Sequence, residues 1–465
     1  MVRMGLKRII LLTVEVYSLK KNDVFECVCT GYGAEGEGIC RVGDMVVFVP
    51  GALTGEKLKI KIVKTAKSYA YGRIEEIISS SGERVEPKCS AFKRCGGCDL
   101  LHMSYDEQLK FKSDRMKDCL ERIGKVKTEI LPIIGADDVC GYRNKVQLPV
   151  GISGGKTVCG YYAGRTHEII ENDGCLTGTE ISEKVKNAVL DWMDEYAVSA
   201  YDEVSGSGTV RHIIVRTSEV TGQSMAVIVI NKKNLPEKDA LADKLKELGI
   251  TTALYNINTK KTNVITGDKT VVLYGNGEIE DELCGLKFMI SPLCFYQINR
   301  AQAERLYEAA LSQAEISDKD IVFDLYCGIG TISLAAAKYA GLVIGAEINE
   351  ESVLQAKKNA KINGLSNAEF YCGDAGEVTD ELYKQGKKAD VIIVDPPRKG
   401  CSDQLLELII KLSPRRVVYV SCNPATLARD LQILEGNGYK TKNARAVDMF
   451  PGTCHVECCV LLCRK

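Results

Sequence analysis

The sequence predicts a multidomain α/β protein that ends in a doubly wound parallel sheet and begins with a small β-barrel. From about residue 286 onward, apolar strand-like runs alternate with helical segments, as in parallel sheets covered by helices. Between residues 23 and 80, short β-rich runs are separated by turns that contain glycine. A chain of 465 residues is also too long for one hydrophobic core, so several domains are expected.

The composition is that of an ordinary globular protein, with 45% hydrophobic and 26% charged residues. No run approaches the roughly 18 apolar residues of a membrane span, so no membrane partner is expected. Residues 1–22 read as an N-terminal tail, with translation starting at Met1 or Met4. The tail lacks a signal-peptide cleavage site, which places the protein in the cytoplasm, and we expect a monomer. Because the net charge is −1, RNA binding would depend on local basic patches.

The segment 23–80 is the predicted barrel. In the run EKLKIKIVK, apolar residues alternate with lysines, which places the two kinds of side chain on opposite faces of a strand. The inward set is Leu58, Ile60 and Ile62, and the outward set is Lys57, Lys59 and Lys61. The lysines form either a basic stripe for phosphate groups or an edge strand protected from aggregation.

The segment 81–285 is a predicted mixed α/β domain without a catalytic signature. A basic amphipathic helix is expected at about 105–135, where it could pack on the catalytic domain 286–465. The runs TVRHIIVRTS and SMAVIVIN are expected strands.

Three of the 20 cysteines stand close together in this segment. Cys89, Cys95 and Cys98 have the spacing C-x5-C-x2-C, which suits thiolate ligands of an iron–sulfur cluster or of zinc. A fourth ligand must come from farther along the chain, and Cys175 is the preferred candidate. The competing candidates are Cys119, Cys140 and Cys159. The alternative is that these thiols are structural, buried and close together by chance. Most of the other cysteines are expected to be buried structural thiols.

The run IVFDLYCGIGTISLAAAKYA predicts a strand, a glycine-rich turn and a helix. Gly328 and Gly330 let the backbone approach a ligand closely, next to the free N–H groups of a helix start. Glu347 ends the next strand, nineteen positions after Gly328, where an acidic residue would bind ribose hydroxyls. The turn departs from the dinucleotide fingerprint G-x-G-x-x-G, which disfavours NAD.

Two further strands end in aspartate. Asp374 follows NAEFYC and suits the adenine edge of a ligand, and Asp395 begins the DPP of ADVIIVDPPRKG. Ligands of doubly wound sheets bind at the carboxyl ends of the strands. Four acidic or glycine-rich strand ends in this order therefore predict a cofactor site.

The next strand, in RVVYVSCNPATLARDL, ends at Cys422 just before a helix, whose N-terminus is expected to lower the pKa of the thiol. Near the C-terminus, strand alternation would aim His455 and Glu457 to one side. A thiolate that adds to C6 of uracil makes C5 nucleophilic enough to take a methyl group, and a base must then remove the C5 proton. Cys422 and Glu457 supply these roles in the hypothesis, and Asp395 orients the uracil ring or the thiol. The target base must leave its stack to reach such a pocket.

The motifs FDLYCGIGTISL, VDPPRKG, VSCNPATLARDL and DMFPGTCHVE together resemble those of the RNA uracil-5 methyltransferases. The run CSAFKRCGGCDLLHMSYDEQL and the N-terminal β segment resemble the iron–sulfur, TRAM-bearing branch that modifies 23S ribosomal RNA. The resemblance covers nearly the whole chain from about residue 23. It implies a Rossmann-like S-adenosylmethionine-dependent methyltransferase domain, an N-terminal TRAM barrel and an RNA partner, most specifically 23S rRNA.

The resemblance also implies residue roles, motif by motif. Cys422 matches the nucleophile and Glu457 the base. The residues expected to contact S-adenosylmethionine are Gln297, Tyr326, Glu347 and Asp395. The ligands expected for a [4Fe–4S] cluster, or for zinc as the alternative, are Cys89, Cys95, Cys98 and Cys175. Radical enzymes that combine such a cluster with S-adenosylmethionine use C-x3-C-x2-C, so the wider first gap here favours a structural cluster.

Four alternatives remain at this stage. A cytosine-5 methyltransferase would also use a cysteine, but it is expected to carry a different motif around its nucleophile. The transfer-RNA members of the same family make the same product but typically lack the barrel and the cysteine cluster. An adenine N6 enzyme would have an aromatic residue after D-P-P, where this chain has Arg398. An RNA-binding or ribosome assembly factor without turnover is the alternative from another class, and the intact Cys422 and Glu457 disfavour it.

Overall fold

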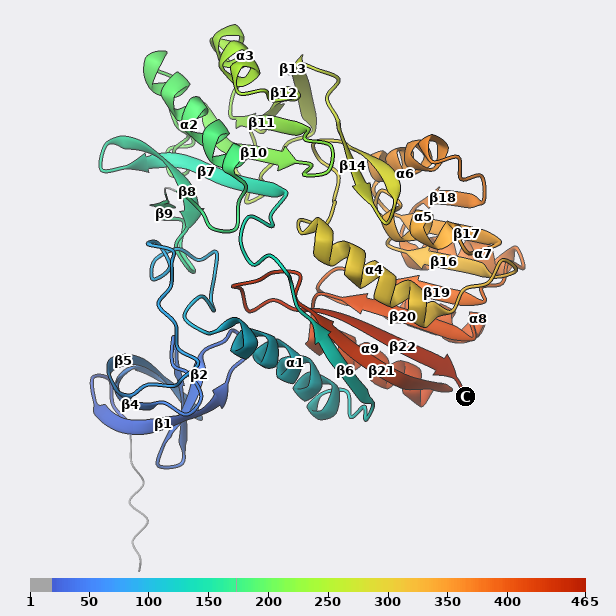
Figure 1. Cartoon of the computed structure of the whole chain (residues 1–465), viewed down its shortest axis with the longest axis horizontal. Helices are drawn as coiled ribbons and strands as arrows, with labels where there is room; N and C mark the ends of the chain where they lie inside the picture. Colours follow the sequence, from blue (N-terminus) through green and yellow to red (C-terminus); the bar gives the residue numbers. More distant parts are fainter. Residues whose placement is uncertain (1–18, 173) are drawn as a thin grey trace, which may run out of the picture. The chain divides into compact units, whose positions relative to one another are not determined.

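The computed structural model describes residues 19–172 and 174–465, which fall into two compact units. Residues 19–85 with His102–Ser104 form the first unit, and Glu86–Leu101 with Tyr105–Lys465 form the second. Figure 1 labels their elements along the chain. Residues 1–18 of the predicted tail lie outside the described residues. None of the helices in the described ranges is both long and apolar enough to cross a membrane.

The first unit is a closed barrel in the strand order β1-β2-β3-β5-β4, as the sequence predicts. Its strands are β1 (Val24–Tyr32), β2 (Gly38–Val42), β3 (Met45–Val49), β4 (Lys57–Thr65) and β5 (Tyr69–Ser79). The predicted alternation in β4 is confirmed, because its three inward apolar side chains, Leu58, Ile60 and Ile62, are fully buried.

The lysine stripe on the outside of β4 is partly neutralised. Lys57 forms an ion pair with Glu26 at 2.9 Å. Lys59 lies between Glu26 on β1 and Glu76 on β5 in the strand register. Alternating charges across neighbouring strands stabilise a solvated sheet surface. The arrangement therefore favours an ordinary exposed strand over a phosphate-binding stripe.

The second unit contains a seven-stranded sheet in the order β13-β12-β11-β10-β7-β8-β9. Its strands are β7 (Lys145–Ser153), β8 (Lys156–Tyr162), β9 (Ile169–Glu171), β10 (Val210–Thr217), β11 (Ser224–Ile230), β12 (Thr252–Ile257) and β13 (Lys269–Tyr274). The helices α2 (Glu180–Glu195) and α3 (Lys238–Glu247) bury Trp192 and Leu245 against one face. The other face contributes Val227 and Val229 to a core that it shares with the second sheet.

The second sheet of this unit has eight strands in the order β18-β17-β16-β19-β20-β22-β21-β6, and its first five strands are parallel. The strands are β6 (Glu129–Ile134), β16 (Ile321–Leu325), β17 (Leu342–Glu347), β18 (Ala368–Cys372), β19 (Val391–Val394), β20 (Arg416–Ser421), β21 (Tyr439–Val447) and β22 (Glu457–Arg464). A hairpin, β14 (Ile279–Leu283) with β15 (Leu286–Ile290), precedes the parallel part.

Helices cover both faces of this sheet, so the predicted doubly wound architecture is confirmed (Figure 1). One face carries α4 (Arg300–Ala314), α5 (Thr331–Ala337) and α6 (Glu350–Ile362). The other carries α1 (Tyr105–Arg122), α7 (Ala375–Lys384), α8 (Asp403–Leu412) and α9 (Pro424–Gly436). Successive residues of β19 alternate between the two cores: Val391 and Ile393 enter one, and Ile392 and Val394 enter the other. An uninterrupted apolar strand is what such two-sided burial requires.

The helix predicted at about 105–135 is shorter than expected. α1 ends at Arg122, the chain turns at Gly124 and Lys125, and 129–134 forms β6 at the edge of the eight-stranded sheet. A Cβ atom at Gly124 would lie 2.6 Å from the carbonyl oxygen of Ala428 on α9, so the close helix contact requires glycine. A segment assigned by sequence to the central domain thus completes the C-terminal sheet.

Candidate active site and cysteine pocket

The predicted nucleophile and base meet at the carboxyl edge of the eight-stranded sheet. Asp395 follows β19, Cys422 follows β20, and Glu457 begins β22. β22 is antiparallel to β20, with Ser421 opposite Cys458, so the next position along the pair sets Cys422 opposite Glu457. Strand pairing alone therefore brings together residues that lie far apart in the sequence.

Cys422 is half-buried beside Asn423, the N-cap of α9. The pKa of its thiol is raised to about 11, first by burial and then by Glu457 and Asp395, against the opposing effect of Arg398. The sequence-based expectation of a lowered pKa is wrong, because burial and the two carboxyl groups outweigh the helix terminus. The neutral thiol predominates at physiological pH, so covalent chemistry here needs a proton acceptor.

The two carboxyl groups beside the thiol differ in protonation. Glu457 is only 4% exposed, and burial, reinforced by Asp395, holds its pKa well above the usual range. Burial raises the pKa of Asp395 to about 6, which leaves that side chain mostly ionised at neutral pH. Neighbouring acids whose pKa values are pushed apart can serve as proton donor and acceptor in one site.

A cation and a neutral imidazole stand beside these acids. Nη2 of Arg398 lies 3.4 Å from Nε2 of His455. Burial, reinforced by Arg398, lowers the pKa of His455 to about 4, so the imidazole is neutral at physiological pH. The side-chain amide of Asn423 donates to the carbonyl oxygen of Arg398 at 2.9 Å, which fixes the DPPRKG loop to the start of α9.

The glycine-rich turn after β16 is fixed by Glu347. The N–H of Gly328 donates to one carboxylate oxygen of Glu347 at 3.1 Å, and the N–H of Asn349 donates to the other at 2.8 Å. Gly328 has φ +55°, and a Cβ atom there would meet nothing within 4 Å, so the turn borders open space. Tyr326 has φ +77°, an uncommon conformation for a side chain of this size that often marks functional sites.

The other two predicted cofactor contacts have different surroundings. Gln297 is nearly buried in the segment before α4, where its main-chain oxygen accepts from the side chain of Asn144 at 2.9 Å. Asp374 follows β18 as predicted and caps α7 by accepting from the N–H of Gly376 at 2.8 Å. The structure therefore assigns Asp374 a local structural role in addition to its place at the sheet edge.

Asp324 in β16 is a candidate site residue that the sequence analysis missed. It is fully buried and accepts from the hydroxyl of Ser333 at 2.5 Å, and burial raises its pKa to about 7. Its other carboxylate oxygen has no hydrogen-bond partner among the described residues. The available signal was an aspartate inside the apolar run IVFDL, since buried acids seldom occur without a functional or structural reason.

The loop 448–456 leads directly into Glu457, and α1 holds its start and its end. Lys112 and Asp448 form a fully buried ion pair at 2.5 Å, and the hydroxyl of Tyr105 donates to Asp448 at 2.8 Å. Arg115 donates to the carbonyl oxygen of Cys454 at 2.5 Å. Because both ends are bonded to one helix, the loop is restrained on the side that carries Glu457.

The segment that carries three of the predicted cluster cysteines also binds this loop. The N–H groups of Asp99 and Leu100 donate to the carbonyl oxygen of Gly452 at 3.0 and 2.9 Å. The carboxylate of Asp99 accepts from the N–H of Cys454 at 3.1 Å. Residues adjacent to Cys98 therefore help to restrain the loop that leads to Glu457.

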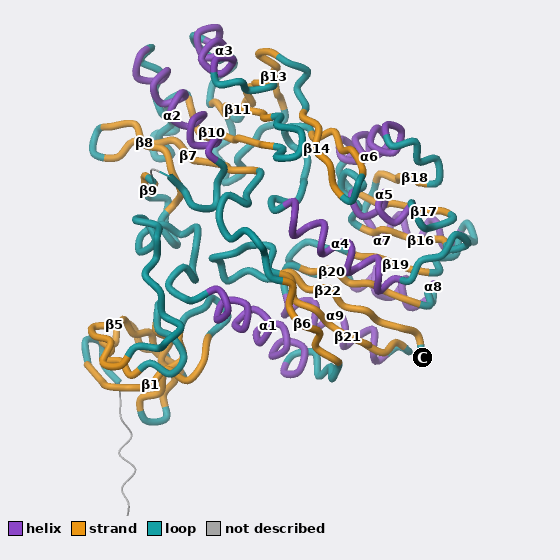
Figure 2. Tube along the Cα trace, in the orientation of Figure 1, coloured by secondary structure: helices purple, strands orange, loops and turns teal. Residues whose placement is uncertain are grey.

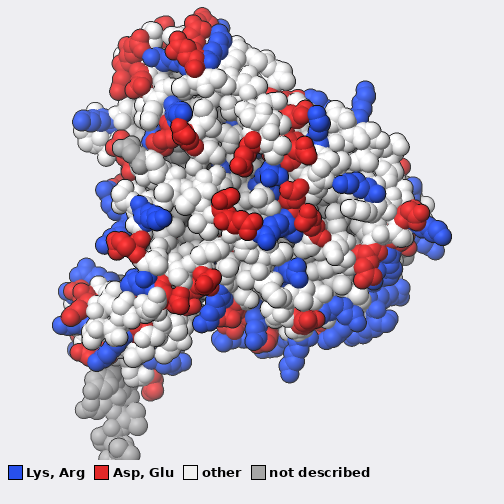
Figure 3. Space-filling view, in the orientation of Figure 1, with Lys and Arg blue, Asp and Glu red and all other residues white. Residues whose placement is uncertain are grey.

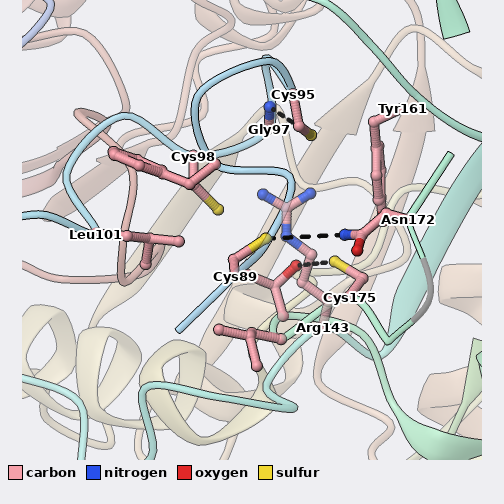
Figure 4. A pocket seen from close by; sticks show the side chains of 12 residues that line it. Cys89, Cys95, Gly97, Cys98, Leu101, Arg143, Tyr161, Asn172 and Cys175 are labelled. Carbon is pink, nitrogen blue, oxygen red and sulfur yellow. Dashed lines mark hydrogen bonds between the residues drawn. The ribbon is translucent and has the colours of Figure 1, made fainter. Parts of the chain in front are cut away.

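The four predicted cluster cysteines, Cys89, Cys95, Cys98 and Cys175, line one pocket together with Arg143 and Tyr161 (Figure 4). Three of them come from the segment between β5 and α1, which Figure 2 shows as loop, and Cys175 follows β9. Three hydrogen bonds to these sulfurs involve Gly97, Asn172 and Thr177. The N–H of Gly97 donates to Cys95 at 3.4 Å, the side chain of Asn172 donates to Cys89 at 3.9 Å, and the sulfur of Cys175 lies 3.3 Å from the hydroxyl of Thr177.

The competing fourth cysteines lie elsewhere. Cys119 packs against the core under the eight-stranded sheet, Cys140 is exposed, and Cys159 is fully buried under the seven-stranded sheet. As the side chains stand in the described ranges, no three His, Cys, Asp or Glu groups are arranged to hold a metal ion.

Comparison with known proteins identifies the relatives of this chain. A family model described as "tRNA (Uracil-5-)-methyltransferase" matches residues 219–465, and one described as "TRAM domain" matches residues 24–74. The chain belongs to the tRNA (uracil-5-)-methyltransferase family. A protein named uncharacterized RNA methyltransferase from Clostridium tetani is 45% identical over 446 residues, which cover 96% of this chain and 97% of that protein. One from Listeria innocua is 44% identical over 453 residues, which cover 97% and 100%.

A solved structure of the tRNA (uracil-5-)-methyltransferase family has the same architecture. The tRNA (uracil-54, C5)-methyltransferase of Pyrococcus abyssi, in complex with S-adenosyl-L-homocysteine, is 26% identical to this chain. It matches with a TM-score of 0.76 over 94% of this chain and 100% of its own. The predictions of a Rossmann-like methyltransferase fold, an N-terminal TRAM barrel and membership in an RNA uracil-5 methyltransferase family are confirmed.

A local basic surface lies at the opposite edge of the sheet from Cys422. Figure 3 shows lysine and arginine side chains gathered on the surface near the C-terminus of the chain. A surface hollow there, next to the starts of β19 and β20, is lined by five cations: Lys387, Lys388, Lys411, Arg415 and Arg464. Arg415 is paired with Asp320 at 2.7 Å. In a chain of net charge −1, this is the kind of local patch that RNA phosphates require.

Proposed function

We propose that this protein uses S-adenosylmethionine to methylate C5 of a uridine in 23S ribosomal RNA through a covalent bond between Cys422 and C6. The observation that carries the proposal is the meeting of Cys422, Asp395 and Glu457 at one sheet edge, next to the glycine-rich turn. A thiol flanked by two acids fits a reaction in which a nucleophile loses a proton and a base later removes another.

The reaction balances with these groups. The sulfur of Cys422 adds to C6 of uracil, its proton passes to Asp395, and the ring electrons move to the C4 oxygen as an enolate. C5 then bonds to the methyl carbon, and the methyl–sulfur bond breaks to leave S-adenosylhomocysteine. Glu457 removes the C5 proton, the C5–C6 double bond forms again, and Cys422 leaves as a thiolate that regains its proton.

The protonation states of the free protein match the first step. Asp395, with a pKa raised to about 6 by burial, is ionised at neutral pH and can accept the thiol proton. Glu457 holds its proton more strongly because of burial and of Asp395, so it must lose that proton before it can act as the base. When bound, S-adenosylmethionine supplies the methyl group and a sulfonium charge that favours the ionised form of Glu457.

The methyl donor would lie over the glycine-rich turn. Glu347, already fixed by the turn, would accept hydrogen bonds from the ribose hydroxyls. Tyr326, Gln297 and Asp395 complete the expected contacts. The family relative from Pyrococcus abyssi supports this choice, since its structure contains S-adenosyl-L-homocysteine.

The RNA class is the finer part of the proposal. The TRAM barrel together with the cysteine pocket resembles the branch that modifies 23S rRNA. Transfer RNA is the second candidate, which the whole-length match to a tRNA (uracil-54, C5)-methyltransferase favours. Mapping of 5-methyluridine in ribosomal and transfer RNA from a deletion strain distinguishes them. Loss of a 23S site, restored by the wild-type gene, is the expected result; loss in tRNA alone would move the proposal to tRNA.

We also propose that Cys89, Cys95, Cys98 and Cys175 hold a [4Fe–4S] cluster, with zinc as the alternative. The four thiols share one pocket and have few hydrogen bonds of their own. One zinc ion would draw four sulfurs to about 2.3 Å from a single centre. A [4Fe–4S] cluster would bind each of the four cysteines through a different iron. Its role would be to hold two distant segments together. Iron and acid-labile sulfide measured after anaerobic purification test this; stoichiometric zinc without iron would reverse it.

A further inference from the structure

Three aromatic side chains stand together on the outer surface of the barrel. Phe48 on β3 and Tyr71 on β5 are opposite each other in a parallel pair, and Tyr69 lies two residues away on the same face of β5. Ring centroids are 5.8 Å apart for Phe48–Tyr69 and Phe48–Tyr71, and 5.6 Å apart for Tyr69–Tyr71. Tyr69 packs edge to face with the other two rings, at interplanar angles of 75° and 89°, and the three rings form one aromatic cluster, here called the aromatic triad.

The barrel does not need these rings for its core. Their strand neighbours, Val47, Val49 and Ala70, point inward and are fully buried. The core of the barrel contains none of the triad residues. Tyr69 is 38% exposed, and Phe48 and Tyr71 are half-buried. Outward-facing aromatic rings that lie outside the core and remain partly exposed can mark an interaction surface.

Basic side chains border the triad. Lys64 on β4 is paired in register with Tyr71, Arg41 on β2 is paired with Val46 beside Tyr69, and Lys67 lies in the turn before β5. All three are exposed, and none of them is in an ion pair among the residues that the structure describes. This distinguishes them from Lys57 on the neighbouring surface, which is neutralised by Glu26.

We propose that the aromatic triad is a stacking platform for the bases of single-stranded RNA, with Arg41, Lys64 and Lys67 contacting the phosphates. Aromatic rings surrounded by cations are the physical requirement for such binding, since every base has a face that can stack and every nucleotide carries a charge. This deepens the proposed function, on which it rests for RNA as the ligand class. The triad, and not the lysine stripe of β4, is then the RNA-binding face of the barrel.

The test measures binding of full-length protein to a fluorescein-labelled 12-nucleotide oligouridylate and to an RNA duplex of equal length. Replacement of Tyr69 or Tyr71 by alanine is expected to weaken binding of the single strand about five-fold or more, with little effect on the duplex. Tyr71→Phe keeps the ring and should keep the affinity. Tyr196→Ala, which removes a tyrosine at the end of α2 that is 38% exposed like Tyr69, is the matched control and should bind normally.

Removal of a positive charge beside the triad gives a second, independent test of the proposal. Lys64→Ala should weaken both RNAs and reduce the slope of log affinity against log salt by about one phosphate contact. If alanine at position 71 unfolds the barrel, Tyr71→Leu keeps apolar volume without an aromatic face and should still lose single-strand binding.

Unchanged affinity in a folded Phe48→Ala/Tyr69→Ala/Tyr71→Ala variant would overturn the proposal, and so would equal losses for single strand and duplex. Methylation assays distinguish the RNA-binding platform from the proposed methyltransferase activity. The variants should raise KM for RNA, while kcat at saturating RNA stays near the wild-type value. If wild-type protein forms no 5-methyluridine, the proposed function fails, while the binding measurements still decide the platform.

Discussion

Cys422 and the four pocket cysteines are held in opposite ways. Cys422 lies at a strand end, where the register of β20 with β22 sets its distance from Glu457. The pocket cysteines lie on loops, and their sulfurs are bonded by few protein groups. A reacting thiol must be placed before its substrate arrives, whereas ligand thiols can be drawn into place by the metal they bind.

The two regions are connected through one loop. Residues next to Cys98 bond to Gly452 and Cys454, and the same loop then enters β22 at Glu457. Substitutions at the strand edge are therefore expected to reduce methylation strongly. Substitutions in the pocket are expected to reduce bound metal and the local order of the loop.

Removal of the proposed nucleophile, Cys422, should have the largest effect. Cys422→Ala should reduce 5-methyluridine formation by more than about a thousandfold, since no other group can form the C6 adduct. The assay measures methyl transfer from labelled S-adenosylmethionine to 23S rRNA. Cys140→Ala, at an exposed cysteine, is the matched control and should remain active. Normal methylation by the Cys422 variant would exclude the covalent mechanism through this residue.

Loss of the proposed base, Glu457, should stop the reaction after methyl transfer. Glu457→Gln should lower turnover by about 10²–10⁴-fold, because the C5 proton can no longer be removed and Cys422 cannot leave. A covalent protein–RNA species should then accumulate, visible as a shifted band on a denaturing gel. Glu435→Gln in α9 should give no such band. Fast turnover without an adduct would remove Glu457 from the role of base.

The connection to α1 can be broken at the buried ion pair. Lys112→Met leaves Asp448 buried without its cation and should lower the free energy of unfolding by about 3–5 kcal/mol. Denaturant unfolding measures the change. Lys117→Met, at an exposed lysine of the same helix, should change stability by less than about 0.5 kcal/mol. Equal stability of the two variants would show that the pair does not restrain the loop.

A substitution in the cysteine pocket should reduce the amount of bound metal more than it reduces the methylation rate. Cys98→Ser should reduce iron well below the about four atoms per chain of a full cluster. It should also speed amide exchange in the loop 448–456, because Asp99 and Leu100 bond to Gly452. Cys140→Ser serves as the control for both measurements. Full iron content in the Cys98 variant would exclude this cysteine as a ligand.

The smallest effect concerns the titration of Cys422. Its pKa of about 11 means that alkylation by iodoacetamide, followed by mass spectrometry, should accelerate about ten-fold per pH unit between pH 8 and 10. Asp395→Asn removes a negative charge that disfavours the thiolate, so the pKa should fall and alkylation at pH 8 should rise a few-fold. Slower alkylation in that variant would mean that Asp395 does not act on the thiol in this way.

Much of the site could be predicted because its signals are local. Some strand ends of the doubly wound sheet combine an apolar run with an acidic residue at the last or next position, as at Glu347 and Asp395. The alternation in β4 likewise fixed which side chains enter the barrel. Asp324 was missed because one acid in an apolar run gives no indication of which groups surround it.

The sequence by itself determined the family and the order of the strand ends, and it singled out Cys422 as the proposed nucleophile, since each depends on residues that are neighbours along the chain. Only the tertiary structure decided that 129–134 is a strand of the C-terminal sheet and that Cys175, not Cys119, Cys140 or Cys159, joins the pocket. It also reversed the expected pKa of Cys422. Burial and the approach of distant carboxyl groups are set by packing, and no local pattern records them.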